Sequence, residues 1–244
     1  ISNMKPKVFL TSNVFSDEEI GSNDKISQEI RDQIKSSWKM LNDIAELKVY
    51  EGRFPKEEEI LDTVNDFRPN IIGCHLSHSI TSQMLENDEI WAVATSTAGF
   101  NHIERTDEDD VLITNTPGVL HYTVADYTIA LILANLRNLI DLNRYVWEGK
   151  WTPDDKWDLD QDLSSVIDKK VVGIVGLGEI GTELVKRLHP WGIKLIYYDK
   201  NRCLASEERF PGLECKASLE ELFQESDVVS LHLPLNKHTE GLID

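Results

Sequence analysis

The sequence lacks paired cysteines and a secretion signal. Its three cysteines, Cys74, Cys203 and Cys215, are scattered and form no C-x-x-C pair or metal-ligand spacing. Neither a disulfide framework nor a bound metal is therefore expected, and a reducing, cytoplasmic location is favoured. The first ten residues also lack the charged, apolar and small segments of a signal peptide.

Basic residues and long apolar runs are also scarce. The chain of 244 residues holds 25 Lys and Arg against 43 Asp and Glu, which gives a net charge of −18. Nucleic acids and anionic membranes expose phosphates that require basic patches, so neither is an expected partner. The longest apolar stretch, Thr128–Ile140, includes Asn135 and Arg137 and is too short to span a bilayer.

The most informative segment of the sequence is residues 171–199, VVGIVGLGEIGTELVKRLHPWGIKLIYYD. The apolar run Val171–Val175 predicts a buried strand, a helical pattern follows it, and a second apolar run covers Ile193–Tyr198. Three glycines follow the first strand at G-x-G-x-x-G spacing: Gly176, Gly178 and Gly181. A strand, glycine turn, helix and second strand in this order predict a dinucleotide-binding unit.

Each glycine of this unit has a separate physical role. Gly176 permits a tight turn, Gly178 lets the backbone approach a pyrophosphate, and Gly181 lets the helix pack closely on the strand. The helix begins near Glu179 and Ile180, whose backbone N–H groups are expected to face the phosphates. A strand–helix–strand unit with a glycine-rich turn and no ligand is the alternative interpretation.

An acidic residue, Asp199, ends the second predicted strand. A carboxylate in this position accepts hydrogen bonds from the ribose of the adenosine half of NAD. The extra phosphate of NADP would meet that carboxylate at a cost of about 4 kcal/mol per charge pair at an effective dielectric near 20. Lys200 and Arg202 offset only part of this repulsion. NAD is therefore the expected cofactor, and NADP is less favoured.

The remaining sequence also alternates between strand-like and helix-like runs, which predicts parallel sheets covered by helices. In the first hundred residues the expected strands are Val8–Leu10, Leu47–Tyr50, Ile71–Cys74 and Trp91–Thr95, and the expected helices are Ile26–Leu41, Lys56–Phe67 and Ile80–Leu85. A second series contains a strand at Val111–Thr114, one long helix from Val124 to about Trp147, a polar connector at Trp151–Asp162, a capping box at Ser218 and Glu221, and a strand at Val228–Leu233.

Four stretches together resemble the D-isomer-specific 2-hydroxyacid dehydrogenases: Ala98–Glu104 (AGFNHIE), Thr114–Leu120 (TNTPGVL) with the helix after it, Val172–Gly181 (VGIVGLGEIG), and Ser230–Leu235 (SLHLPL). Their order and spacing extend the resemblance over nearly the whole chain. The resemblance implies an α/β protein with a flavodoxin-like substrate domain at residues 1–103. A Rossmann-type NAD-binding domain, incomplete at its C-terminus, would occupy residues 104–244, and the active cleft would lie between the two.

The resemblance also implies an activity and a partner. The intact protein would transfer a hydride between NAD(H) and a small 2-oxo or 2-hydroxy acid, with specificity for the D-isomer. It would form a homodimer through residues Tyr122–Trp151, although a helix buried wholly within its own domain is the alternative. Trp147, Trp151 and Trp157 are interpreted as packing residues of this connector and not as a ligand-stacking group.

The resemblance further implies site residues. The substrate carboxylate would bind the loop at Leu76, Ser77 and His78, with Gly99 at the same edge, although His78 is more often a solvated loop histidine in such a place. Besides the glycine loop and Asp199, the implied cofactor contacts are Val124, His232, Leu233, Pro234 and Thr239. Two of these have plainer interpretations, Val124 as a core residue and Thr239 as a turn residue.

Several features depart from the family pattern. Asp126 stands where the family usually has Glu, and Asp107–Asp110 is unusually acidic. The Arg, Glu and acid/base His of the family lie further along than Asp244, so no catalytic residue is assigned within 1–244. The chain as written is expected to bind cofactor weakly and not to turn over, and which 2-oxo acid the intact protein takes stays open.

A second function class is an NAD-responsive, corepressor-like binding protein, since such proteins share this fold and glycine motif. The acidic charge and the absence of an obvious peptide-docking extension argue against it.

Overall fold

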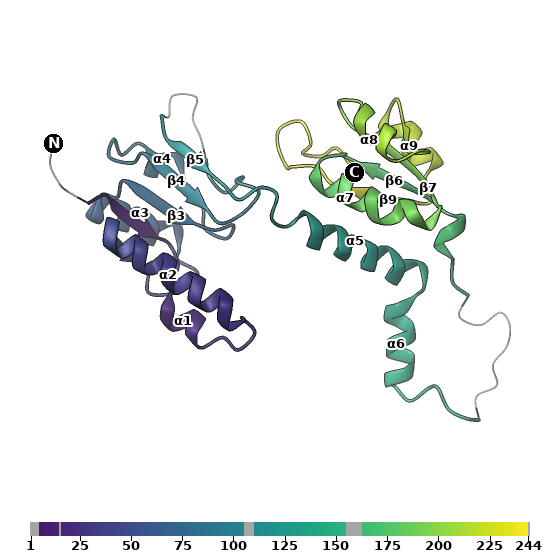
Figure 1. Ribbon diagram of the computed structural model, residues 1–244, viewed down its shortest axis with the longest axis horizontal. Coiled ribbons are helices and arrows are strands. Elements are labelled where there is room, and N and C mark those ends of the chain that lie inside the picture. The colour runs from purple at the N-terminus through teal and green to yellow at the C-terminus, as the bar shows by residue number, and fades with distance from the viewer. Residues whose placement is uncertain (1–4, 15, 105–109, 155–162, 244) are drawn as a thin grey trace. The chain divides into compact units, whose positions relative to one another are not determined.

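The structure, a computed structural model, describes residues 5–14, 16–104, 110–154 and 163–243. It divides into two units, Ile1–Pro117 and Gly118–Asp244, each with its own sheet (Figure 1). The two units are described separately below.

The first unit is built on a five-stranded parallel sheet in the order β2-β1-β3-β4-β5. Its strands are β1 (Lys7–Leu10), β2 (Glu46–Val49), β3 (Ile71–Cys74), β4 (Ala92–Thr95) and β5 (Leu112–Thr114). This is the flavodoxin-like strand order, in which the sequence of strands across the sheet reverses between β1 and β3. The observed sheet confirms the predicted α/β class.

The helices of the first unit are α1 (Asp17–Gly21), α2 (Gln28–Ile44), α3 (Glu57–Phe67) and α4 (Ser82–Leu85). The core contains side chains from α3 and α4 packed with the strand residues Phe9, Ile72 and Val93. By contrast, α2 has no fully buried residue, and its Met40 is 63% exposed. The helix α2 is therefore an amphipathic cover for the sheet and not part of its centre.

The division between the units differs from the predicted one after residue 103. The strand β5 pairs in parallel with β4, with Ala92 opposite Leu112 and Ala94 opposite Thr114. From its sequence pattern this strand was expected in the second series, because strand-like patterns do not show which sheet a strand joins. Pairing with β4 extends the first unit to Pro117.

The second unit has a four-stranded parallel sheet in the order β8-β7-β6-β9. Its strands are β6 (Val171–Val175), β7 (Lys194–Tyr198), β8 (Glu214–Cys215) and β9 (Val228–Leu231). Its helices are α5 (His121–Leu136), α6 (Leu139–Trp147), α7 (Glu179–Leu188), α8 (Leu204–Arg209) and α9 (Leu219–Glu225), with short 3₁₀ turns η1 (Ile167–Lys169) and η2 (His189–Trp191). The order corresponds to strands 3-2-1-4 of a Rossmann fold.

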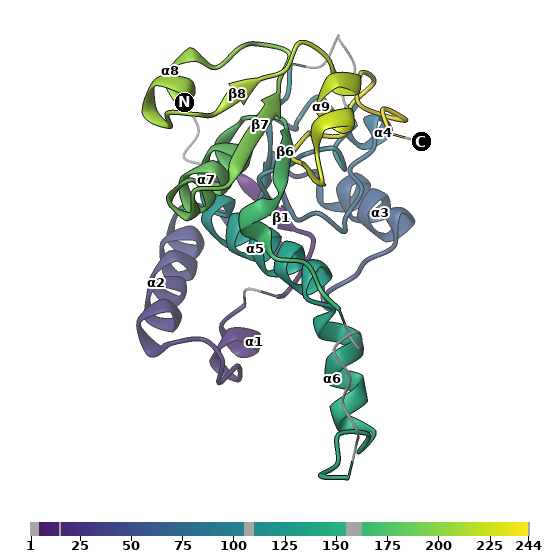
Figure 2. The same cartoon turned by 90° about the vertical axis from the view of Figure 1, so that its right-hand side faces the viewer.

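Helices cover both faces of this second sheet. On one face α5 and α7 pack side by side (Figure 2), and Ala125 and Leu184 share a core with Ile174 of β6. On the other face Leu222 of α9 packs against Val175 and Ile196. Successive residues of β6 thus face opposite layers, as the period of a strand buried on both sides requires.

The long helix predicted from Val124 to Trp147 is two helices. Asn138 has φ of +50°, in the left-handed region that ends a helix, and it separates α5 from α6. Returning chain binds this break: Asn138 Nδ2 donates to Leu163 O at 3.2 Å, and Ser165 N donates to Leu136 O at 2.8 Å. Asn tolerates this backbone conformation better than other side chains, so the break lies at Asn138.

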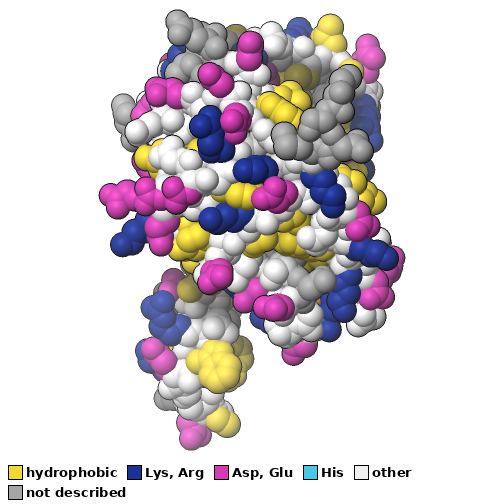
Figure 3. Space-filling view, turned by 90° about the vertical axis from the view of Figure 1, so that its left-hand side faces the viewer, with side chains coloured by type: hydrophobic (Ala, Val, Ile, Leu, Met, Phe, Trp, Pro, Cys, Tyr) yellow, Lys and Arg dark blue, Asp and Glu magenta, His cyan; other side chains and the backbone are white. Residues whose placement is uncertain are grey.

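Charged side chains of both signs cover the surface. On the face shown in Figure 3, Asp and Glu side chains are interleaved with Lys and Arg, despite the net charge of −18. None of the helices in the described part of the chain has the length and apolarity that crossing a bilayer requires.

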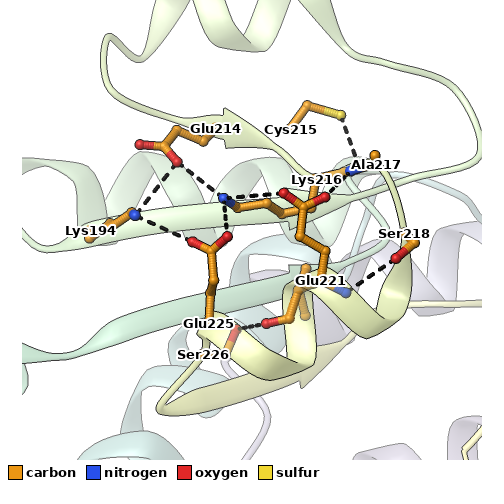
Figure 4. A network of polar contacts seen from close by, with 10 residues as sticks. Lys194, Glu214, Cys215, Lys216, Ala217, Ser218, Glu221, Glu225 and Ser226 are labelled. Atoms are coloured by element: carbon orange, nitrogen blue, oxygen red, sulfur yellow. Dashed lines mark hydrogen bonds and ion pairs between the residues drawn. The ribbon is translucent and has the colours of Figure 1, made fainter.

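One buried cation joins α9 to the edge strand β8. Lys216, 8% exposed, places its Nζ 2.8 Å from Glu225, 3.3 Å from Glu214 and 3.9 Å from Glu221 (Figure 4). The more exposed Lys194 reaches two of these carboxylates, Glu225 at 3.5 Å and Glu214 at 3.6 Å. Lys216 therefore holds a two-residue strand that few backbone hydrogen bonds could hold alone.

The predicted capping box lies beside this cation. Ser218 Oγ accepts a hydrogen bond from Glu221 N at 3.2 Å, as predicted, and begins α9. Glu221 Oε2 accepts a hydrogen bond from Ala217 N at 2.9 Å, one residue before the N-cap, and its Oε1 lies 3.9 Å from Lys216 Nζ.

Replacing Lys216 should destabilise the chain more than replacing Lys194. We expect Lys216→Met to lower the free energy of unfolding by about 2 kcal/mol. That is less than the ~3–5 kcal/mol of a fully buried pair, because the three carboxylates are 38–50% exposed. Lys194→Met should cost under about 1 kcal/mol. Urea unfolding at pH 7 measures both, and equal costs would contradict this role of Lys216.

The difference in stability between wild type and Lys216→Met should depend on pH. The hydrogen bond from Lys216 lowers the pKa of Glu225. The stabilising effect of this bond is therefore present above the unfolded-state pKa of glutamate. It is lost as the pH falls through the lower pKa of Glu225 in the folded state. The gap between wild type and Lys216→Met should shrink below about pH 4.

Candidate functional site

The glycine loop of the second unit joins β6 to α7 through very close backbone contacts. Gly176 has φ of +92°, and a Cβ there would lie 2.5 Å from the carbonyl oxygen of His232. A Cβ at Gly181 would lie 2.2 Å from the carbonyl oxygen of Gly176. Only glycine fits at either position, so the loop is held tightly against β6 and the end of β9.

Gly178, in contrast, borders open space. It is the N-cap residue of α7, and a Cβ at this position would meet no atom within 4 Å. The first backbone N–H groups of α7, at Glu179 and Ile180, have no carbonyl partner within the helix. An uncrowded helix N-terminus attracts anions, so the residues present fit the pyrophosphate of a dinucleotide.

Asp199 lies beside this loop at the end of β7. Its Oδ2 accepts a hydrogen bond from Leu177 N at 2.8 Å, and its Oδ1 accepts one from Asn201 N at 3.1 Å. An ionised carboxylate offers about four acceptor positions, so about two remain for hydroxyl groups. The carboxylate is thus fixed in place and still able to accept hydrogen bonds from a ribose.

The segment after β9 presents its backbone to the glycine loop. His232 N donates to Val175 O at 2.8 Å, and the His232 carbonyl lies against Gly176. The imidazole instead contacts Ser230 Oγ through Nε2 at 2.9 Å, and burial lowers the pKa of His232. The ring is therefore neutral near pH 7 and directed back along its own strand.

The other predicted cofactor residues line two pockets of the second unit. Val124 of α5 and His232 share a pocket of about 560 Å³ between α5 and β9. Leu233, Pro234 and Thr239 line a smaller pocket of about 250 Å³. The Thr239 hydroxyl accepts a hydrogen bond from Asn236 N at 2.9 Å, which is the contact of a turn threonine.

In the first unit, His78 is not the solvated loop histidine that the sequence favoured. It is 1% exposed, its Nε2 lies 2.7 Å from the carbonyl oxygen of Arg53, and its Nδ1 lies 2.6 Å from Thr11 Oγ1. A carbonyl only accepts, so Nε2 carries the proton and Nδ1 accepts from the Thr11 hydroxyl. Burial also lowers the pKa of His78. The neutral ring joins the loop after β3 to the end of β1.

The other predicted substrate residues are exposed. Leu76 and Ser77 precede His78 on the same loop, and Gly99 follows β4, where its carbonyl accepts a hydrogen bond from Thr97 Oγ1 at 2.7 Å.

A pocket of about 340 Å³ lies at the carboxyl ends of the strands of the first sheet, and none of the four predicted substrate residues lines it. The residues that line it include Thr11, Ser12, Trp38, Cys74, His75, Thr95, Asn115 and Thr116. The pocket spans β1 and β3, where the strand order reverses and ligands of such sheets bind. Most of these residues end or follow a predicted strand, which is the sequence signal that could have found them.

The titratable groups at this edge are neutral near pH 7. Burial raises the pKa of the Cys74 thiol to about 11, so it is not an activated nucleophile. Burial lowers the pKa values of His75 and His102, and His102 Nε2 lies 3.1 Å from Thr95 Oγ1. None of the described residues that line the pocket is Asp, Glu, Lys or Arg, so a carboxylate ligand would meet no negatively charged side chain there.

No cluster of three His, Cys, Asp or Glu side chains suited to a metal occurs among the described residues. Trp147 and Trp151 are 82% and 64% exposed, whereas Trp157 and Asp107 lie outside the described residues. Asp126, at the position where the family pattern has Glu, forms an ion pair with Arg187 of α7 at 2.6 Å.

Comparison with known proteins relates the chain to one family. The sequence model for the NAD binding domain of D-isomer specific 2-hydroxyacid dehydrogenases matches residues 129–244. Glyoxylate reductase from Thermofilum pendens is 32% identical over 84% of this chain and 60% of its own length. Glyoxylate reductase from Thermococcus litoralis is 30% identical over 98% of this chain and 67% of its own length.

The fold is also similar to that of a solved structure. A solved glyoxylate reductase from Paecilomyes thermophila superimposes with a TM-score of 0.77 at 21% identity, covering 98% of this chain and 68% of that one. The chain spans about 60 to 67% of the length of the two sequence relatives.

Two glycine substitutions should separate ligand binding from folding. Gly178→Val places its side chain in the open space where we expect the pyrophosphate. It should weaken NADH binding about 100-fold through lost charge-assisted hydrogen bonds while leaving the melting temperature unchanged. Gly181→Val should prevent folding of the second unit, because its Cβ would clash with Gly176 O. Fluorescence titration and thermal melting test both. Wild-type NADH affinity in Gly178→Val would mean that the loop binds no phosphate.

Proposed function

The chain belongs to the D-isomer-specific 2-hydroxyacid dehydrogenase family, and on this basis we propose that the intact protein transfers a hydride between NAD(H) and a small 2-oxo or 2-hydroxy acid. The observation that supports this most strongly is the open space at Gly178, the N-cap of α7, together with the carboxylate of Asp199, which is bonded to the adjacent Leu177. A phosphate and a ribose of one dinucleotide require these two features side by side.

The chain supplies a position for each part of the cofactor. Backbone N–H groups of Glu179 and Ile180 hold the pyrophosphate, and Asp199 accepts the ribose hydroxyls. The backbone of His232–Pro234 and the side chain of Val124 lie along the nicotinamide half. The bound nicotinamide supplies the hydride chemistry, and the protein orients it.

The substrate is assigned to the carboxyl edge of the first sheet. We assign the substrate carboxylate to the loop of Leu76 and Ser77, with Gly99 at the same edge. His78 acts indirectly, since its bonds to Thr11 and Arg53 fix the loop. We assign no described residue to proton transfer, because the imidazoles at this edge are held in hydrogen bonds and the Cys74 thiol is not activated.

Two curated relatives are named glyoxylate reductase, which makes glyoxylate the first substrate to test. These names give no support to the NAD-responsive corepressor as an alternative. A cytoplasmic location fits the three cysteines, all of which are free.

A second copy of the chain is the proposed partner, bound along residues 122–151. The helix α6 has no buried residue, so it is not buried within its own domain. Its Ile140 and Trp147 are 67% and 82% exposed. They are seven residues apart and therefore lie on one face of the helix. Large apolar side chains on one face indicate an interaction site.

Turnover by the intact protein tests the activity. NADH should be oxidised in the presence of glyoxylate, and the reduction of pyruvate should yield D-lactate. Glycolaldehyde, which has a carbonyl but no carboxylate, should leave NADH unchanged because the carboxylate orients the substrate. Loss of absorbance at the NADH band measures each rate. Tight NADH binding without reduction of any 2-oxo acid would favour a binding protein instead.

Oligomeric state tests the partner. The double variant Ile140→Asp/Trp147→Asp should weaken the dimer at least about 100-fold, since buried aromatic anchors dominate such interfaces. Leu204→Asp is the control, because Leu204 is also exposed but lies on α8. Light scattering with size exclusion should show a monomer for the first variant and a dimer for the second. A dimer in both would place the interface elsewhere.

A further inference from the structure

The loop between β7 and α8 carries an arginine close to the ribose-binding carboxylate. Arg202 follows Asp199 by three residues, on the loop whose Asn201 N–H is bound by Asp199. Its side chain is 64% exposed, so solvent reaches the guanidinium. An arginine near the end of this strand is the residue type that accommodates the 2′-phosphate of NADP in dinucleotide-binding folds.

In this chain the guanidinium is already occupied. Arg202 Nε donates to Glu207 Oε1 at 2.9 Å, and Nη2 donates to Glu207 Oε2 at 2.7 Å. This is the parallel, two-bond pairing that guanidinium groups form equally with carboxylates and phosphates. Glu207 thus occupies the donors that a 2′-phosphate would need.

A hydrogen bond from Tyr197 fixes the position of the Glu207 carboxylate. Its side chain is 17% exposed, and its Oε1 also accepts a hydrogen bond from the hydroxyl of Tyr197 at 2.7 Å. Tyr197 lies fully buried in β7, and its oxygen accepts a bond from Cys203 N at 2.8 Å. The bonds from Arg202 and Tyr197 lower the pKa of Glu207 to about 2, so it stays ionised at physiological pH.

We propose that Glu207 is a cofactor-specificity residue, which selects NAD over NADP by holding Arg202 in a bidentate ion pair and so withholding its guanidinium from a 2′-phosphate. Glu207 is a positioning residue, because it acts through Arg202 and touches no cofactor itself. This inference rests on the proposed function, in which Asp199 receives the adenosine ribose. Asp199 repels the phosphate directly, and Glu207 removes the charge that would compensate for that repulsion.

The test compares two substitutions of one charge on α8. Glu207→Gln keeps the shape of the side chain and its bond to Tyr197 but releases Arg202. It should raise NADPH affinity about tenfold and leave NADH affinity unchanged. Glu208→Gln is the matched control, since Glu208 is an exposed neighbour on the same helix. It should change the affinity for either nucleotide less than about twofold.

A second variant approaches the same pair from the other side. Arg202→Lys keeps the positive charge but cannot form the two-bond fork, so its ammonium group leaves Glu207 more easily. NADPH affinity should rise about threefold, and this exposed substitution poses no risk to folding. In Glu207→Gln, adding Arg202→Ala should abolish the gain, which a merely structural role of Glu207 would not predict.

Fluorescence titration with NADH and NADPH at low and high salt separates the outcomes. A gain for NADPH that disappears at high salt supports the inference, because an exposed arginine–phosphate pair is screened. Normal NADH binding with unchanged NADPH affinity in both Glu207→Gln and Arg202→Lys would overturn it and leave the proposed function intact. A wild-type protein that binds neither nucleotide would overturn the proposed function and this inference with it.

Discussion

The contact between Gly181 and the carbonyl of Gly176 is the constraint on which the second unit depends. It brings α7 so close to the end of β6 that no side chain fits between them. The same approach places the N-terminus of α7, with its free N–H groups, at Gly178, where a Cβ would meet no atom within 4 Å. Gly176 and Gly181 thus allow the close packing that forms one side of the site, and Gly178 leaves the site open. Asp199 completes the site by bonding to Leu177 within the loop.

Charge then determines which dinucleotide suits this site. Two carboxylates, Asp199 and Glu207, lie on the loop and helix that follow β7, and the second neutralises the arginine between them. A ribose with two hydroxyls finds acceptors there, whereas a ribose phosphate meets negative charge and an occupied guanidinium. The first unit works differently, because the described residues that line its pocket at the ends of β1 and β3 include Thr11, Ser12 and His75 but no Asp, Glu, Lys or Arg. The proposed hydride transfer needs the charged site to orient the cofactor and the loop of Leu76 and Ser77 to receive the acid.

Much of this was predictable from the sequence, and the exceptions have identifiable causes. The strand at Ile71–Cys74 was predicted with its observed bounds, because a short apolar run between turn residues is a local signal. The glycine loop was also predicted, since its spacing reflects backbone geometry. The break at Asn138 was missed because it is held by Leu163, which is distant in the sequence. The burial of His78 was missed for the same reason, as its partners Thr11 and Arg53 come from other parts of the chain. The sheet to which β5 belongs likewise depends on pairing and not on pattern.

A crystal structure of the protein with NADH would show whether the glycine loop and Asp199 bind the cofactor. We expect pyrophosphate oxygens within about 3 Å of the backbone nitrogens of Glu179 and Ile180, together with ribose hydroxyls hydrogen-bonded to Asp199. Arg202 should remain paired with Glu207 in that complex. NADH bound away from the glycine loop, or a loop refolded so that side chains fill the space beside Gly178, would contradict the account.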